Sequence, residues 1–149
     1  MRSVVQRVSS ASVSVDQQVL GKIAHGLVIL LGIHGDDTSK EIKWMADKVL
    51  NLRIFEDQEG KMNNSLFDIK GEVLIVSQFT LYGDCRKGRR PGYSTAARPE
   101  IAEPLYEQFT AYVREQGVYA ATGKFQAQME VALVNDGPVT LLLDSDKTF

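Results

Sequence analysis

Three short segments of this 149-residue chain combine residue types that could do chemistry. The first is Ser77-Gln78-Phe79-Thr80, which follows an apolar run that begins at Val73. Its polar side chains carry a hydroxyl, an amide and a second hydroxyl at positions where the apolar pattern would otherwise continue. The ends of strands often present functional groups. The segment could therefore bind a polar substrate. The alternative, that Ser77 and Thr80 only satisfy neighbouring backbone groups, stays open at this point.

The second segment is Asn135-Asp136-Gly137-Pro138-Val139-Thr140, which lies between two apolar stretches. Asn, Asp, Gly and Pro in this order are typical of a turn, and a simple connecting turn is the plainer interpretation. The bond before a proline can also be cis, and a cis proline in a turn is usually a fixed feature. A cis bond before Pro138 would redirect carbonyl oxygens, which could then face a ligand.

The third segment, Arg86 to Tyr93, holds four cations and one aromatic residue in eight positions. This composition favours contact with phosphate groups and stacking on nucleic-acid bases. An exposed, solvated loop is the alternative interpretation. The formal net charge of the whole chain is −2, so any nucleic-acid contact must depend on a local basic patch.

Several familiar catalytic signatures are missing. The chain has no G-x-S-x-G elbow, no P-loop and no G-x-G-x-x-G sequence. The two histidines, His25 and His34, and the single cysteine, Cys85, match no zinc-binding spacing. We therefore expect neither a metal nor a cofactor.

Composition and hydropathy indicate an ordinary globular domain, with 44% hydrophobic and 24% charged residues. No apolar run approaches the ~20 residues of a membrane-spanning helix, since the longest extends only from Leu27 to Ile33. The first residues, Met1 to Arg7, lack the apolar stretch of a signal peptide. We expect a single domain over residues 1–149, located in the cytoplasm and without membrane contact.

Periodicity predicts the elements that must position the three segments. Alternating apolar residues predict a hairpin that turns at Asp16–Gln18, followed by a buried strand over 27–32. Thr38 and Glu41 form a capping-box signature ahead of apolar residues at helical spacing, which predicts a helix over 39–50. The remaining expected elements are strands over 53–55, 73–79, 124–134 and 139–143 and a helix around 105–113.

The stretch 83–98 should be irregular because it holds three glycines and a proline. The later helix should begin near Pro104 and stop at Gly117. Many strands and two helices favour an α+β fold over a doubly wound α/β fold. We expect curved, largely antiparallel or mixed β-sheets with the helices packed on one side.

Taken together, the motifs resemble those of the D-aminoacyl-tRNA deacylases of bacteria and eukaryotes, over essentially the whole chain. One departure is that Gly92 and Tyr93 replace the commoner Ser and Phe of the family; Tyr93 can still stack on adenine. The resemblance is carried by Met1-Arg2-x-Val4-Val5-Gln6-Arg7-Val8, by Gly60-Lys61-Met62-Asn63 with Ser65-Leu66 and Asp68, by Ser77-Gln78-Phe79-Thr80-Leu81 and by Asn135-Asp136-Gly137-Pro138-Val139-Thr140.

The resemblance implies a homodimeric enzyme, with active sites at the subunit interface, that hydrolyses the ester of D-aminoacyl-tRNA without a metal. Ser77, Gln78 and Thr80 would bind the aminoacyl ester and the terminal adenosine. Main-chain amides near Phe79 and Thr80 would stabilise the oxyanion. Thr80 is also a candidate nucleophile, although no histidine or lysine is evidently placed to activate it. The terminal 2′-hydroxyl of the tRNA is implied to take part.

The resemblance also implies a means of selection. The Gly137–Pro138 bond would be cis, and its loop would reach into the partner's site, where its carbonyls admit a D-side chain or glycine and exclude an L-side chain. The products would be the free D-amino acid and tRNA, and glycine mischarged on tRNA-Ala would be a further substrate. Arg7 either orders the site or is an ordinary salt-bridged strand residue. The residues assigned to substrate binding are Gly137, Pro138, Asn135, Thr140, Tyr93, Arg7 and Met129.

Two other interpretations stay open. A non-catalytic RNA-binding module would be served equally well by the loop from Arg86 to Arg98. A hydrolase of small D-amino-acid esters or amides would use Thr80 covalently and would act without tRNA.

Overall fold

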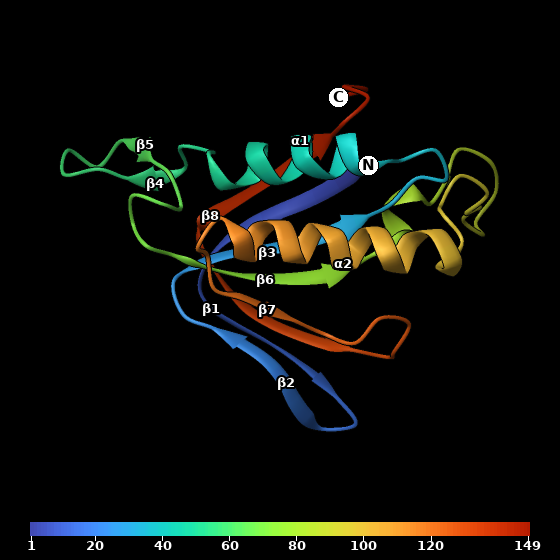
Figure 1. Cartoon of the computed structure of the whole chain (residues 1–149), viewed down its shortest axis with the longest axis horizontal. Helices are drawn as coiled ribbons and strands as arrows, with labels where there is room; N and C mark the ends of the chain where they lie inside the picture. The colour runs from blue at the N-terminus through green and yellow to red at the C-terminus, as the bar shows by residue number, and fades with distance from the viewer.

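The fold is organised around its first strand. The computed structural model describes all residues, 1–149. One edge of β1 (Arg2–Val15) pairs antiparallel with β3 (Gly26–Gly32) and with β2 (Gln18–Ile23), as Figure 1 shows. Its other edge pairs antiparallel with β8 (Glu130–Asp144). Because β1 is hydrogen-bonded on both sides, a side chain that it carries has a fixed position in the sheet.

The sheet continues beyond β3 with two parallel strands. β3 pairs with β6 (Glu72–Ser77), and β6 pairs with β7 (Ala120–Thr122), which completes a six-stranded mixed sheet. The sheet curls so far that β2 meets β7, where a Cβ on Gly21 would lie only 2.8 Å from the carbonyl oxygen of Thr122. A separate two-stranded sheet of β4 (Phe55–Glu56) and β5 (Met62–Asn64) projects from one side (Figure 1).

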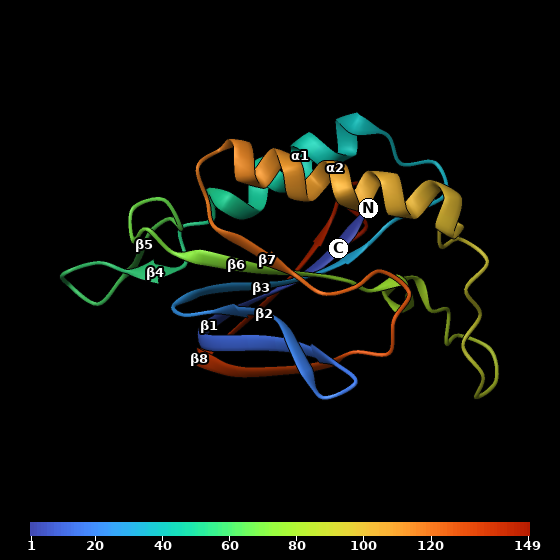
Figure 2. The same ribbon diagram turned by 60° about the horizontal axis from the view of Figure 1, so that its bottom comes forward.

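Two helices, α1 (Ser39–Leu50) and α2 (Pro99–Glu115), cover one face of this sheet, and β1, β2 and β8 curve away below them (Figure 2). The Thr38 side chain accepts from the Lys40 backbone N–H, and the Glu41 side chain accepts in return from Thr38, so the capping box is confirmed. The helices and the sheet bury a core cluster of 23 residues. The expected α+β fold with helices on one side is therefore confirmed.

Several expected boundaries were wrong. The strand expected over 53–55 is the short β4 at Phe55–Glu56, and the strand expected over 73–79 ends at Ser77. A 3₁₀ helix, η1 (Phe79–Tyr82), follows it. The expected strand over 124–134 begins only at Glu130, because the preceding residues form a loop in which Gln126 has φ of +62°.

The second helix starts earlier than expected. Pro99 occupies its first turn, where the fixed φ of proline suits a helix and its missing N–H costs no hydrogen bond. Pro104 consequently lies inside the helix and not near its start.

Neither α1 nor α2 combines the length and the apolar character that a membrane crossing requires.

Candidate active site

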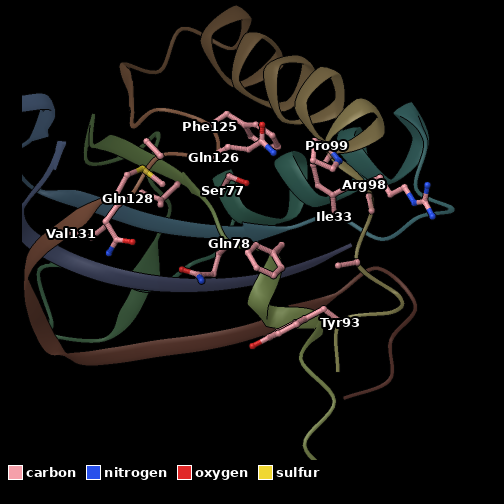
Figure 3. A pocket seen from close by; sticks show the side chains of 17 residues that line it. Ile33, Ser77, Gln78, Tyr93, Arg98, Pro99, Phe125, Gln126, Gln128 and Val131 are labelled. Atoms are coloured by element: carbon pink, nitrogen blue, oxygen red, sulfur yellow. The ribbon is translucent and has the colours of Figure 1, made fainter. Parts of the chain in front are cut away.

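The main candidate site is a pocket of about 750 Å³ at the carboxyl end of β6. Figure 3 shows its walls, which come from the end of β6, from the beginning of α2 with the residues before it, and from the loop ahead of β8. A largely apolar cavity of this size with a few polar groups is typical of a small-molecule site. The lining residues are Ile33, Val76, Ser77, Gln78, Phe79, Tyr93, Ala96, Ala97, Arg98, Pro99, Ala102, Phe125, Gln126, Ala127, Gln128, Met129 and Val131.

Parallel pairing with β3 fixes the polar residues at the end of β6, since the pairing of β6 with β7 ends at Ile75. Ser77 is the last residue of β6 to pair with β3, opposite Leu31, and the Gln78 N–H donates to the Leu31 carbonyl at 2.8 Å. From α2, the Tyr106 hydroxyl donates to the Ile75 carbonyl at 2.7 Å, and burial raises the pKa of Tyr106 well above its usual value. Tyr106 therefore stays a neutral donor that ties α2 to this strand.

Thr80 lies just beyond the pocket, in η1. Its hydroxyl oxygen accepts a hydrogen bond from the Gln78 side-chain amide, and no histidine, lysine or carboxylate bonds it. An amide N–H cannot remove a proton, so Thr80 has no base to activate it. The Phe79 and Thr80 amides open η1, and the first N–H groups of a helix have no partner within that helix. The segment therefore offers hydrogen-bond donors and lacks an activated nucleophile.

Two aromatic rings stand at the mouth of the pocket. Phe79 and Tyr93 meet edge to face, with ring centroids 5.1 Å apart and an interplanar angle of 69°. Both rings are substantially exposed, Phe79 to 56% and Tyr93 to 39%. An exposed aromatic face beside an apolar pocket is suited to stacking on a planar base.

The segment Asn135–Thr140 is a bulge inside one strand, and the expectation of a turn between two strands was wrong. β8 pairs with β1 on both sides of the segment, with Asn135 opposite Val8 and Thr140 opposite Gln6. Four residues, 136–139, therefore face Arg7 alone. The Gly137–Pro138 peptide bond within the bulge is cis, as the resemblance implied.

Two side chains hold this bulge in shape. Across its neck, Asn135 accepts from the Val139 N–H at 2.7 Å and donates to the Val139 carbonyl and the Thr140 hydroxyl at 3.1 Å each. From β1, the buried Arg7 side chain, which is 4% exposed, donates to the Asp136 carbonyl at 2.9 Å and to the Ile54 carbonyl at 2.6 Å. Asn135, Thr140 and Arg7 thus build the bulge, which presents Gly137 and Pro138 to solvent.

The bulge does not reach the pocket of its own chain. Arg7 pairs with Leu27, whereas Ser77 pairs with Leu31, so the two sites are separated along the strands by four residues, roughly 13 Å. Across the sheet, β1 and β3 lie between β8 and β6, which adds about 14 Å at the usual strand spacing. Within one chain the two motifs therefore lie on the order of 20 Å apart.

Comparison with known proteins shows where this pair of motifs belongs. The sequence model described as D-Tyr-tRNA(Tyr) deacylase matches residues 4–144. The chain belongs to this family. A D-aminoacyl-tRNA deacylase from Desulfotalea psychrophila is 62% identical over 149 residues, which is all of both chains. Membership in the deacylase family confirms the expectation of an enzyme of the hydrolase class.

Solved structures extend the likeness to the fold. The structure of c-Myc DNA Unwinding Element Binding Protein superposes with a TM-score of 0.91 at 44% identity, covering 97% of this chain and 99% of that one. A probable eukaryotic D-amino acid tRNA deacylase superposes with a TM-score of 0.83 at 18% identity, covering 95% and 97%. The curved sheet with its two helices is thus shared with a solved structure in which few residues are identical to those of this chain.

The structure sorts the predicted site residues of this deacylase-family chain into two places. Five of them line the pocket, namely Ser77, Gln78, Phe79, Tyr93 and Met129. Thr80 adjoins it, and Gly137, Pro138, Asn135, Thr140 and Arg7 form the remote bulge. A single chain thus does not bring the two groups together.

The sequence prediction missed residues in two walls of the pocket, one before α2 and one ahead of β8. Ala96, Ala97 and Phe125 line it, together with the loop from Gln126 to Gln128. Phe125 is anchored by Tyr106 of α2, with ring centroids 6.0 Å apart. The signal available in the sequence was polar residues at 124, 126 and 128, which alternate as they would in a strand and therefore pointed to the wrong structure.

Proposed function

We propose that the protein hydrolyses the ester bond of D-aminoacyl-tRNA and releases the free D-amino acid and tRNA. The observation that carries this proposal is an apolar pocket with exposed aromatic rings at its mouth and amide donors at the end of β6. Such a pocket fits a terminal adenosine that carries a small acyl group. The family and the name of the 62% identical relative support the same reaction.

The chemistry needs little from the protein because an aminoacyl ester is already activated. The amides of Phe79 and Thr80 would stabilise the oxyanion of the tetrahedral intermediate, and the polar side chains of Ser77 and Gln78 would hold the ester. The attacking group would be water positioned by the bound tRNA, whose terminal 2′-hydroxyl lies beside the ester. No step of this scheme requires a side-chain base, which accords with the surroundings of Thr80.

Selection by chirality would come from the bulge of a second copy of the chain. The bulge lies too far from its own pocket, and its tip at Gly137 and Pro138 faces solvent. Carbonyl oxygens of a partner's bulge placed against the substrate α-carbon would leave room for hydrogen or a D-side chain and would exclude an L-side chain. Glycine mischarged on tRNA-Ala would then be accepted as well.

A homodimer would also cover an open edge. β8 has 15 residues, and in a single chain its outer edge pairs with no strand. Val134 and Leu142 on this strand are 57% and 59% exposed. Long exposed edges with apolar side chains are normally covered in a native protein, and a second copy would cover this one. The proposed reaction would take place in the cytoplasm, because aminoacyl-tRNA is used there.

Deacylation of matched D-Tyr-tRNA and L-Tyr-tRNA by the purified protein, with a chelator present, tests the activity. We expect rapid loss of the D-ester and slow loss of the L-ester, with no effect of the chelator. Equal or absent hydrolysis of the two esters would remove the deacylase assignment for this chain. Loss of activity with the chelator would instead contradict the metal-free scheme.

Mixing two inactive variants tests the shared site. Ala127→Trp fills the pocket, and Gly137→Ala distorts the bulge. When the two variants refold together and pair at random, about half of the dimers are mixed. In each mixed dimer, one of the two sites combines an intact pocket with an intact bulge, so the mixture should recover about a quarter of the wild-type rate. If pocket and bulge act within one chain, no mixture recovers activity.

A second candidate function is nucleic-acid binding without catalysis. The 44% identical protein of known structure is named as a DNA-binding protein, and this chain has a basic loop at 86–90. This role predicts affinity for uncharged tRNA but no hydrolysis of either ester. The same deacylation assay therefore separates the two functions.

A further inference from the structure

The loop between Gly83 and Tyr93 is a closed projection beside the pocket. Its neck is an isolated antiparallel bridge, in which Asp84 and Gly92 exchange backbone hydrogen bonds of 2.7 and 3.0 Å. At its tip, Gly88 has φ of +70°, a conformation that glycine adopts readily. Figure 1 shows the loop standing beyond the end of the sheet, next to the start of α2.

The cations of this loop differ in whether they have a carboxylate partner. Arg86 donates to both oxygens of Asp84, at 2.9 and 2.7 Å, and these bonds hold the pKa of Asp84 well below its usual value. The Asp84–Arg86 pair is therefore internally neutral. Lys87, Arg89 and Arg90 are exposed, and no carboxylate lies within 4.0 Å of any of them. Three free positive charges thus stand together on a chain whose net charge is −2.

The root of the loop joins these charges to the pocket. A Cβ on Gly83 would lie 3.1 Å from the Tyr93 ring, so the neck packs directly on the aromatic residue at the pocket mouth. A second, open cavity of about 740 Å³ lies at the root of the loop, and its walls include Gly83, Arg86 and the hydroxyl residues Ser94 and Thr95 that follow Tyr93. A strand whose end occupies the pocket would therefore leave it past Tyr93 and along this loop.

We propose that Lys87, Arg89 and Arg90 form a docking surface for the sugar-phosphate backbone of the nucleotides that precede the terminal adenosine. The proposal rests on the proposed function, because it takes the pocket as the site of that adenosine. Free guanidinium and ammonium groups bind phosphates and release counterions, which makes binding depend on salt. The segment 84–90 carries no large apolar side chain to insert into a lipid surface, so the chemistry favours a nucleic-acid strand over a membrane.

The test compares the wild type with the triple variant K87A/R89A/R90A. The affinity for uncharged tRNA, measured by fluorescence anisotropy, should fall on the order of 10- to 100-fold at ~0.1 M salt, and the slope of log affinity against log salt should decrease by about 2 to 3. The value of kcat/KM for D-Tyr-tRNA should fall because KM rises, while kcat stays the same. The value for the D-tyrosyl ester of free adenosine, which lacks preceding nucleotides, should not change.

Two matched variants separate charge from structure. K87R/R89K/R90K keeps the three charges and should keep wild-type affinity. K43A/K48A/K70A removes three exposed lysines elsewhere and should leave both affinity and salt slope unchanged. Equal tRNA affinity and salt slope in K87A/R89A/R90A and the wild type would overturn the docking surface. If that variant instead loses binding to anionic vesicles while it keeps tRNA affinity, the loop binds membranes and the proposal is wrong.

Failure of the proposed function would be visible separately. A wild type that cleaves neither D-Tyr-tRNA nor the adenosine ester is not a deacylase, yet the anisotropy measurement with uncharged tRNA still decides the role of the loop.

Discussion

The position of Gly137 leaves no room for a side chain. Its φ is +137°, and an added Cβ would lie 2.8 Å from the Val139 side chain and 3.0 Å from the Val139 nitrogen. The buried Arg7 guanidinium closes the third side at 3.2 Å. Glycine is therefore required by the local backbone whatever the bulge contacts in a second copy.

Gly137→Ala should consequently distort the bulge and leave the rest of the fold intact. We expect the free energy of unfolding to fall by about 1–3 kcal/mol and deacylation of D-Tyr-tRNA to fall on the order of 100-fold. Urea titration and single-turnover kinetics measure the two effects. Gly35→Ala is the control, since nothing lies within 4 Å of its added Cβ. Normal activity in Gly137→Ala would exclude the bulge from the site.

Thr80 provides a test of covalent catalysis at the scale of one hydroxyl group. Its oxygen accepts from Gln78 and has no base beside it, so we expect Thr80→Ala to lower kcat by less than about tenfold. Removing a true nucleophile costs far more, on the order of 10⁴-fold or greater. A loss of that size, with an acyl-enzyme trapped on the wild type, would establish the small-ester hydrolase in place of the proposed mechanism.

At the scale of elements, the carboxyl end of β8 is held in place by the hydrogen bonds of Asp144. Asp144, which is 4% exposed, accepts from the Arg2 guanidinium, from the Asp146 N–H and from the Thr148 hydroxyl. Burial alone would raise the pKa of Asp144, but these hydrogen bonds outweigh it and hold the pKa below the ordinary 3.8. The ionised carboxylate therefore fastens the carboxyl end of β8 to the beginning of β1.

A depressed folded-state pKa stabilises the protein above the ordinary value of 3.8 and loses that effect as pH falls through the lower folded value. Since Asp144 stays ionised between about pH 5 and pH 8, we expect its titration to leave the urea midpoint of the wild type unchanged there and to lower the midpoint below about pH 4. Asp144→Asn should be less stable at neutral pH and should show a shallower acid decline. Parallel pH profiles for the two proteins would contradict this linkage.

The elements also differ in how far local sequence could predict them. The bounds of α1 follow from local signals, because Thr38, Glu41 and the apolar spacing all lie within that helix and its cap. The bulge in β8 could not be predicted in this way. Asn-Asp-Gly-Pro suits a turn between two strands equally well, and only long-range pairing of both halves with β1 decides between them. The pocket was only partly predicted, because Ser77 to Phe79 lie at the end of a strand that the sequence does predict, whereas the strand-like alternation of residues 124–128 does not match the loop that they form.

At the scale of the whole molecule, one chain supplies the pocket and the bulge at separate ends of the strands. Leu142→Lys places a charge on the open strand β8, where a second copy would bury it. We expect a monomer by analytical ultracentrifugation and loss of deacylation, with an unchanged circular dichroism spectrum. Leu20→Lys is the matched control, because Leu20 is 48% exposed on β2, and it should stay dimeric and active. A Leu142→Lys protein that remains an active dimer would place the interface elsewhere.

The bulge in β8 has a consequence for how this protein could change over generations. Without residues 137–139, Asn135, Asp136 and Thr140 would face Val8, Arg7 and Gln6 one for one, and only the register shift between Val8 and Ser10 would still interrupt the pairing of β8 with β1. Loss of these three codons would thus restore most of the strand pairing but would also remove the buried Val139 from the core. Under the proposed function, the ability to reject L-substrates therefore depends on a short insertion into a strand that is otherwise nearly regular.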